Sequence, residues 1–175
     1  TRFDCMGQRA IGRGSIFSAY CDRSKRSAKT RLAWCYGDLG AAVALTLAAR
    51  SLGREEWKEE ALRIALHAAD RPFRDGLKDT SLCHGSSGVA HLFNRLFQYL
   101  GHPRLAEAAV RWYRHCLAAG TTGGFGGYGV ARLSARSEKL DPGFLMGAAG
   151  VALALQAGAS DVAPAWDRVL LCSTP

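Results

Sequence analysis

The chain has 175 residues, of which 48% are hydrophobic and 22% charged, and it carries a formal net charge of +8. This length supports one domain with a hydrophobic core. It contains no apolar run long enough for a transmembrane helix and no signal-peptide pattern. Six cysteines are a modest content for this length and favour a reducing compartment over a disulfide scaffold. We therefore expect a cytoplasmic protein.

The basic charge is concentrated at the start of the chain. Residues 1–32 contain eight Lys or Arg and two Asp, a charge of +6, so the rest contributes only +2. We interpret residues 1–30 as a basic leading segment or loop and residues 31–175 as the folded domain. A solvated loop is the simplest explanation, and an arm for lipid, an acidic peptide or nucleic acid is the alternative. No nucleic-acid-binding motif accompanies the charge, so we expect no nucleic-acid partner.

A Gly-x-x-Gly pattern recurs three times, at Gly37–Gly40, Gly85–Gly88 and Gly147–Gly150, and an apolar run follows each time. A repeat of this size predicts helical hairpins stacked in space. The run at 41–49 is apolar on every face, which predicts a helix buried all round.

Each apolar helix is followed by a more amphipathic one. Residues 54–71 form the first, between Gly53 as a predicted helix cap and Pro72 as a stop. The second pair is predicted over about 85–119, a glycine-rich loop over 120–142, and a third pair from about 147 with a short return helix after Pro164. With no convincing strand, we predict an all-α fold, an α/α toroid, as an incomplete ring of about three hairpins.

Three candidate metal ligands lie just before two of these helices, namely Cys35, Cys83 and His84. Two thiolates and one imidazole are three ligands for Zn²⁺, and a three-ligand zinc keeps a position open for water or substrate. The N–H groups and dipole of a helix start favour negative charge on the thiolates. The spacing alone also allows buried cysteines and a surface histidine.

The segments Trp34-Cys35-Tyr36-Gly37 and Cys83-His84-Gly85 resemble the zinc-binding segments of the lanthionine synthetase C-like (LanC-like) cyclases. The similarity continues through residues 90–96 and 143–150 and covers roughly residues 30–171. Tyr36 favours the stand-alone cyclases of class I lanthipeptide pathways. The resemblance implies concentric rings of inner and outer helices with the site at the mouth of the inner ring. It also implies that residues 31–175 correspond to the C-terminal half of such a domain.

For function, the resemblance implies a zinc-dependent cyclase in which Cys35, Cys83 and His84 bind the metal. Such an enzyme adds the Cys thiols of a dehydrated precursor peptide to dehydroalanine or dehydrobutyrine and forms lanthionine thioether rings. Arg31, Trp34 and Tyr36 would line the site as catalytic residues. The precursor peptide, a lanthipeptide dehydratase and a transporter are the implied partners.

Other functions remain open from the residues. The same metal would serve a protein that binds thiols or glutathione, or a non-catalytic helical scaffold with structural zinc. The Cys and His ligands argue against a sugar-processing toroid. A prenyl-transferring toroid would use an Asp as a metal ligand, and the candidate ligands here include no Asp. The family also uses an upstream His and Asp, and residues 1–30 contain no His. We therefore expect this chain alone to close rings slowly. His91 is expected to be a core residue or to contact a metal-binding residue without binding the metal itself.

Overall fold

The computed structural model describes residues 14–17, 30–72, 79–120, 128 and 141–173. Most of the predicted leading segment 1–30 and of the loop 120–142 lies outside these ranges. Within them the chain forms helices and no strand, which confirms the all-α prediction. The helices are α1 (Gly37–Leu52), α2 (Glu55–Ala69), α3 (Ser86–Leu100), α4 (Pro103–Ala118), α5 (Ala148–Ala159) and the short 3-10 helix η1 (Ala165–Leu170).

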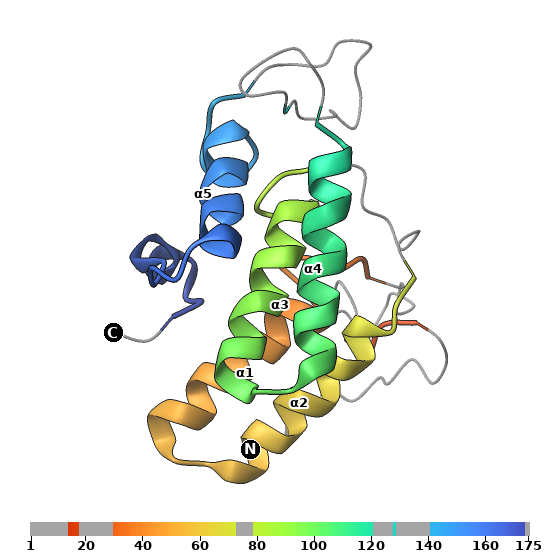
Figure 1. Ribbon diagram of the computed structural model, residues 1–175. Coiled ribbons are helices and arrows are strands. Elements are labelled where there is room, and N and C mark those ends of the chain that lie inside the picture. The colour runs from red at the N-terminus through yellow and green to blue at the C-terminus, as the bar shows by residue number, and fades with distance from the viewer. Residues whose placement is uncertain (1–13, 18–29, 73–78, 121–127, 129–140, 174–175) are drawn as a thin grey trace, which may run out of the picture.

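The helices form two layers (Figure 1). Helices α1, α3 and α5 lie side by side with α3 in the middle, and all three run in the same direction. Helix α2 returns along α1, helix α4 returns along α3, and these two outer helices contact each other. The apolar runs thus form the inner layer and the amphipathic ones the outer layer. Two hairpins are complete, and α5 with η1 begins a third.

The hairpin turns follow the local sequence. Gly53 ends α1 at φ +62° and its N–H bonds within the last turn, as predicted for a glycine cap. Gly101 ends α3 in the same left-handed conformation, at φ +72°. The next residue, His102, accepts a hydrogen bond from the Arg104 N–H through Nδ1 and caps α4, with Pro103 in the first turn. A capping role for His102 was not predicted, because its residue type rarely signals one.

Helix α3 is the centre of the core. It contacts α1, α2, α4 and α5, so its side chains from Ser86 to Phe93 are all buried. The amphipathic helix α4 places Trp112 against it, and Cys116 is fully buried as predicted for a core cysteine. The largest fully buried core side chains are Trp112, Phe93, Leu32, Leu39, Ile64, Leu82, Leu92, Leu96 and Leu105.

The prediction that α1 is buried all round is wrong for the described structure. Ala44 is exposed, and Leu45, Leu47 and Ala48 are only half-buried. Among the described elements α1 packs against α2 and α3, so one side of it has no helix against it. Its apolar composition therefore exceeds what the described contacts bury.

The C-terminal segment packs against α3 and the first loop. Asp167 of η1 is fully buried, and its Oδ2 lies 3.0 Å from both His91 Nε2 and Arg95 Nε. The Trp34 indole N–H donates to the carbonyl oxygen of Leu170 at 2.8 Å. The core position expected for His91 is confirmed. The predicted short return helix is present as a 3-10 helix.

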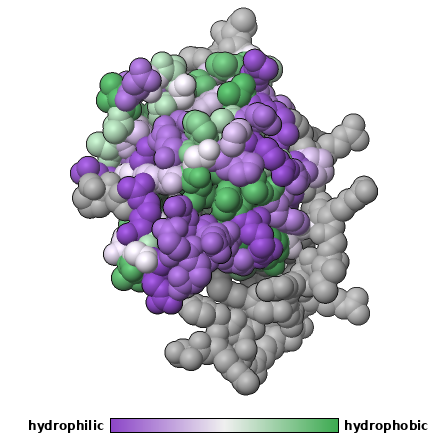
Figure 2. Space-filling model, turned by 60° about the horizontal axis from the view of Figure 1, so that its bottom comes forward, coloured by the Kyte–Doolittle hydropathy of each residue, from purple (hydrophilic) through white to green (hydrophobic). Residues whose placement is uncertain are grey.

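Hydrophobic side chains also reach the surface. Figure 2 shows an apolar area between hydrophilic residues on the face it presents. The exposed large hydrophobic residues are Leu52, Phe97, Val110, Leu117, Leu145, Val162, Val169 and Leu171. None of the helices in the described part of the chain has the length and apolar character needed to cross a membrane.

Candidate functional site

The site is built from three loops that precede the inner helices α1, α3 and α5. In each loop the second glycine of Gly-x-x-Gly lets the first helical turn lie against a carbonyl oxygen of the loop. A Cβ atom at Gly40, Gly88 or Gly150 would lie 2.3, 1.8 or 1.9 Å from that oxygen. Only glycine allows such an approach. This contact explains why the pattern recurs, and it gives the three loops the same path.

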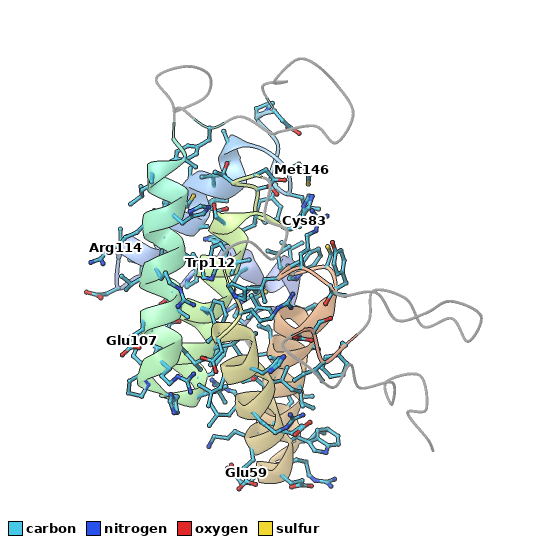
Figure 3. All side chains as sticks on the ribbon, turned by 90° about the vertical axis from the view of Figure 1, so that its right-hand side faces the viewer. Glu59, Cys83, Glu107, Trp112, Arg114 and Met146 are labelled. Atoms are coloured by element: carbon cyan, nitrogen blue, oxygen red, sulfur yellow. The ribbon has the colours of Figure 1, made fainter. Side chains whose placement is uncertain are left out.

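Backbone hydrogen bonds join the loops into a row. The Trp34 N–H donates to the Cys83 carbonyl at 3.0 Å, and the Cys83 N–H donates to the Leu145 carbonyl at 2.9 Å. Figure 3 accordingly shows Cys83 and Met146 close together, far from Glu59 at the opposite end of the helices. Cys83 therefore occupies the middle loop, between the other two.

Corresponding positions of the loops carry different chemistry. Two residues before the first glycine the loops place Cys35, Cys83 and Leu145, and one residue before it they place Tyr36, His84 and Met146. The first two loops thus present thiols, and the third presents a leucine whose backbone bonds Cys83. In the described structure, the candidate metal ligands therefore come from the first two loops, and the third loop supports Cys83 through a backbone hydrogen bond.

The two predicted thiol ligands meet. Cys35 is exposed, Cys83 is half-buried, and both are free cysteines. The Cys35 side chain lies close enough to Cys83 to act on its ionisation. Burial and the adjacent Cys35 thiol raise the pKa of Cys83 to about 12, while the charge of Arg31 acts in the opposite direction. The Cys83 thiol therefore holds its proton at neutral pH, and a divalent cation would favour its loss.

His84 follows Cys83 in the second loop, and its ring is directed at its own loop. Its Nδ1 lies 3.3 Å from Ser81 Oγ, and its Nε2 lies 3.8 Å from Asp79 Oδ2. Burial lowers the pKa of His84, the Asp79 carboxylate opposes that change, and the positive charge of Arg31 adds to it. The neutral imidazole that results is the form that binds metal ions.

Arg31 and Tyr36 form a contact pair at the first loop. Arg31 Nε donates a hydrogen bond to the Tyr36 hydroxyl, and its guanidinium carbon lies 5.6 Å from the centre of the Tyr36 ring. The charge of Arg31 acts on both Cys83 and His84. Arg31 therefore lies close enough to act on both residues, and Tyr36 is held beside Arg31. Trp34, predicted to line the site, uses its indole N–H to bind Leu170.

The start of the first loop is held from behind by buried polar groups. Arg71 of the segment after α2 donates to the Thr30 carbonyl and lies 3.4 Å from the carboxylate of Asp38, which is fully buried. The same carboxylate accepts the Phe17 N–H at 2.9 Å. These contacts fix the loop that carries Cys35 against the body of the domain.

The donor chemistry of the site suits zinc, although the three predicted ligands are not converged. No group of three or more His, Cys, Asp or Glu side chains is arranged around one metal position in the described ranges. The Cys35 and Cys83 thiols fit a thiolate-binding metal such as Zn²⁺. His84 follows Cys83 directly, and both of its nitrogens face Ser81 and Asp79. Binding by all three residues thus requires the imidazole to turn toward the thiols.

One residue of this site was not predicted from the sequence. Asp79 is nearly buried and contacts both the loop backbone and His84. A signal for it was present, because Asp79 precedes Gly85 by the same spacing with which Asp141 precedes Gly147. That repeat marks a loop position, but the contact with His84 depends on how the loop folds.

Comparisons with known proteins agree with this architecture. The family model described as "Lanthionine synthetase C-like protein" matches residues 12–171. The solved structure of nisin cyclase superposes with a TM-score of 0.65 at 20% sequence identity, covering 85% of this chain and 33% of nisin cyclase. This chain thus spans about a third of that protein, and the similarity supports the predicted α/α toroid fold. No curated protein sequence matches the chain.

Proposed function

Because the chain belongs to the lanthionine synthetase C-like family, we propose that it acts in zinc-dependent formation of lanthionine thioether rings. In this proposal Cys35, Cys83 and His84 hold the metal, and the substrate is a dehydrated precursor peptide with free Cys thiols. The observation that carries the proposal is the proximity of the Cys35 and Cys83 side chains, whose two loops are joined by the hydrogen bond from the Trp34 N–H to the Cys83 carbonyl. The bound metal would supply Lewis acidity that keeps an incoming thiol deprotonated at neutral pH.

The protein side chains would handle the charge and the proton of the addition. The peptide thiolate adds to the β-carbon of dehydroalanine or dehydrobutyrine, and the electron pair moves to the amide as an enolate. The Arg31 guanidinium would stabilise this negative charge. The Tyr36 hydroxyl accepts from Arg31 and so keeps its own O–H, which it would donate to the α-carbon. Trp34 would support the loop by holding Leu170.

The zinc assignment is tested on the purified chain by elemental analysis. We expect about one zinc per chain, most of which is lost in Cys35→Ala and in Cys83→Ala because each removes a thiolate ligand. Cys116→Ala is the matched control, since Cys116 is a free cysteine buried in the core. It should keep its zinc. Full retention of zinc in both loop variants would refute the assignment.

The catalytic assignment is tested with a dehydrated peptide that contains free Cys. Alkylation of the remaining thiols followed by mass spectrometry counts the rings that form. We expect Tyr36→Phe to slow ring closure by about 10²-fold or more and to leave zinc content unchanged, because it removes only the proton donor. An unchanged rate in Tyr36→Phe would assign the proton to another group. If the chain binds glutathione as well as the peptide and closes no ring, the thiol-binding alternative is the better function.

A further inference from the structure

The loops before α3 and α5 begin in the same way, each with an aspartate. Asp79 Oδ1 accepts the Ser81 N–H at 2.8 Å, and Asp141 Oδ1 accepts the Gly143 N–H at 2.6 Å. Their backbone carbonyls accept the N–H groups that open the two helices, at 3.1 Å from Ser86 and at 2.8 Å from Ala148. As far as the loop backbone is concerned, the two aspartates therefore have the same role.

The second carboxylate oxygen distinguishes them. Asp79 Oδ2 lies 3.8 Å from His84 Nε2, and the two side chains are only 4% and 11% exposed. The residue of the third loop that corresponds to His84 is Met146, which has no N–H to offer a carboxylate. Asp79 thus has a contact that the fold of the loop alone does not require.

We propose that Asp79 is a positioning residue for His84: its Oδ2 holds the Nε2–H and leaves the lone pair on Nδ1, the nitrogen that would bind the metal. This inference rests on the proposed function. Histidines that bind metal ions generally donate their other N–H to such a partner, which fixes the tautomer and the ring orientation. The separation of 3.8 Å exceeds a hydrogen bond. The proposal therefore includes a shift of the two side chains toward each other, with Nδ1 leaving the hydroxyl of Ser81.

Asp141→Asn is a matched control for Asp79→Asn. Each variant keeps a side-chain oxygen that can accept the loop N–H, and only Asp79→Asn puts an amide NH₂ where His84 needs an acceptor. We expect Asp79→Asn to weaken zinc binding by about 10–100-fold in competition with a chelator. Asp141→Asn should change it less than about threefold. Thermal unfolding of the two metal-free variants should be alike, because their backbone roles match.

A second measurement reads the tautomer directly. Long-range ¹H–¹⁵N NMR of the zinc-loaded wild-type chain should show a proton on His84 Nε2 and the metal on Nδ1. The opposite assignment would overturn the inference, and so would equal zinc affinities of Asp79→Asn and Asp141→Asn while Cys83→Ala loses the metal. That last pattern would leave the proposed function intact. If Cys83→Ala binds zinc as tightly as the wild type, the proposed function fails and the inference falls with it.

Discussion

At the scale of single residues, Cys35 and Cys83 show how two distant positions become one chemical group. Each precedes a helix start, and the bond from the Trp34 N–H to the Cys83 carbonyl sets the two loops side by side. Burial and the neighbouring Cys35 thiol then raise the pKa of Cys83. A pair of this kind either binds a metal or oxidises.

The first prediction follows from that pairing. Mild oxidation of the metal-free chain with diamide should join Cys35 to Cys83, because the two thiols lie close together and neither is fully buried. Intact mass should fall by two hydrogens, and peptide mapping should find the 35–83 crosslink. Added zinc should protect the pair. Oxidation that instead involves the buried Cys116 would contradict the geometry.

At the scale of elements, the start of each inner helix depends on its glycine contact. Gly88→Ala should lower the free energy of unfolding by about 1–3 kcal/mol, because its Cβ atom would lie 1.8 Å from the Leu82 carbonyl oxygen. Gly53→Asn is the control: that position is open and left-handed, and asparagine tolerates the conformation. Urea unfolding measures both. Equal stability of Gly88→Ala and wild type would contradict this, because it would show that the loop backbone can move away from the added Cβ atom without loss of stability.

The packing of η1 on α3 gives a pH-dependent prediction. Burial lowers the pKa of His91, and the neighbouring Asp167 carboxylate only partly opposes this. The folded chain therefore keeps His91 neutral, whereas the unfolded chain takes up a proton below about pH 6.5. Unfolding then binds protons, so the free energy of unfolding should fall as the pH drops from about 6.5 toward 5.

For Asp167, burial alone would raise the pKa, and the contacts with His91 and Arg95 outweigh it and lower the pKa. Its carboxylate thus stays ionised throughout that pH range. Urea unfolding of metal-free chain should show a shallower pH dependence in His91→Gln. His102→Asn, which removes a histidine but keeps a residue able to cap α4, should keep the wild-type dependence. A wild-type slope in His91→Gln would assign the effect to other groups.

At the scale of the whole molecule, the described helices leave apolar side chains exposed. The C-terminal segment exposes Val162, Val169 and Leu171 by 75%, 73% and 76%. Exposed apolar side chains that gather in one region favour association. We expect the purified chain to self-associate at micromolar concentration, as sedimentation velocity would show.

Two substitutions locate that association. Val162→Lys combined with Val169→Lys should shift the chain toward monomer, because it puts charge on the apolar segment. Val110→Lys, at an exposed position of the outer helix α4, should have less effect. A compact monomer over the whole concentration range in the wild type would show that this surface does not mediate association.

Much of this protein could be predicted from the sequence because the signals are local. Helical periodicity, the glycine caps and the repeated Gly-x-x-Gly depend on residues close together in the chain, and they predicted α1 to α5 within a few residues. The candidate ligands Cys35, Cys83 and His84 were found in the same way, by their place before helix starts. Their binding to zinc stays a prediction.

Only the tertiary structure decided which groups meet. The proximity of Cys35 to Cys83 and the bond from Trp34 to Leu170 bring together segments that no local pattern relates. The direction of the His84 ring toward Asp79 is a rotamer that no local pattern specifies. Burial was decided there too: α3 is covered by four helices, whereas the apolar helix α1 has an open side. Composition determines how much surface a helix can bury, but the neighbours available in space determine how much it does bury.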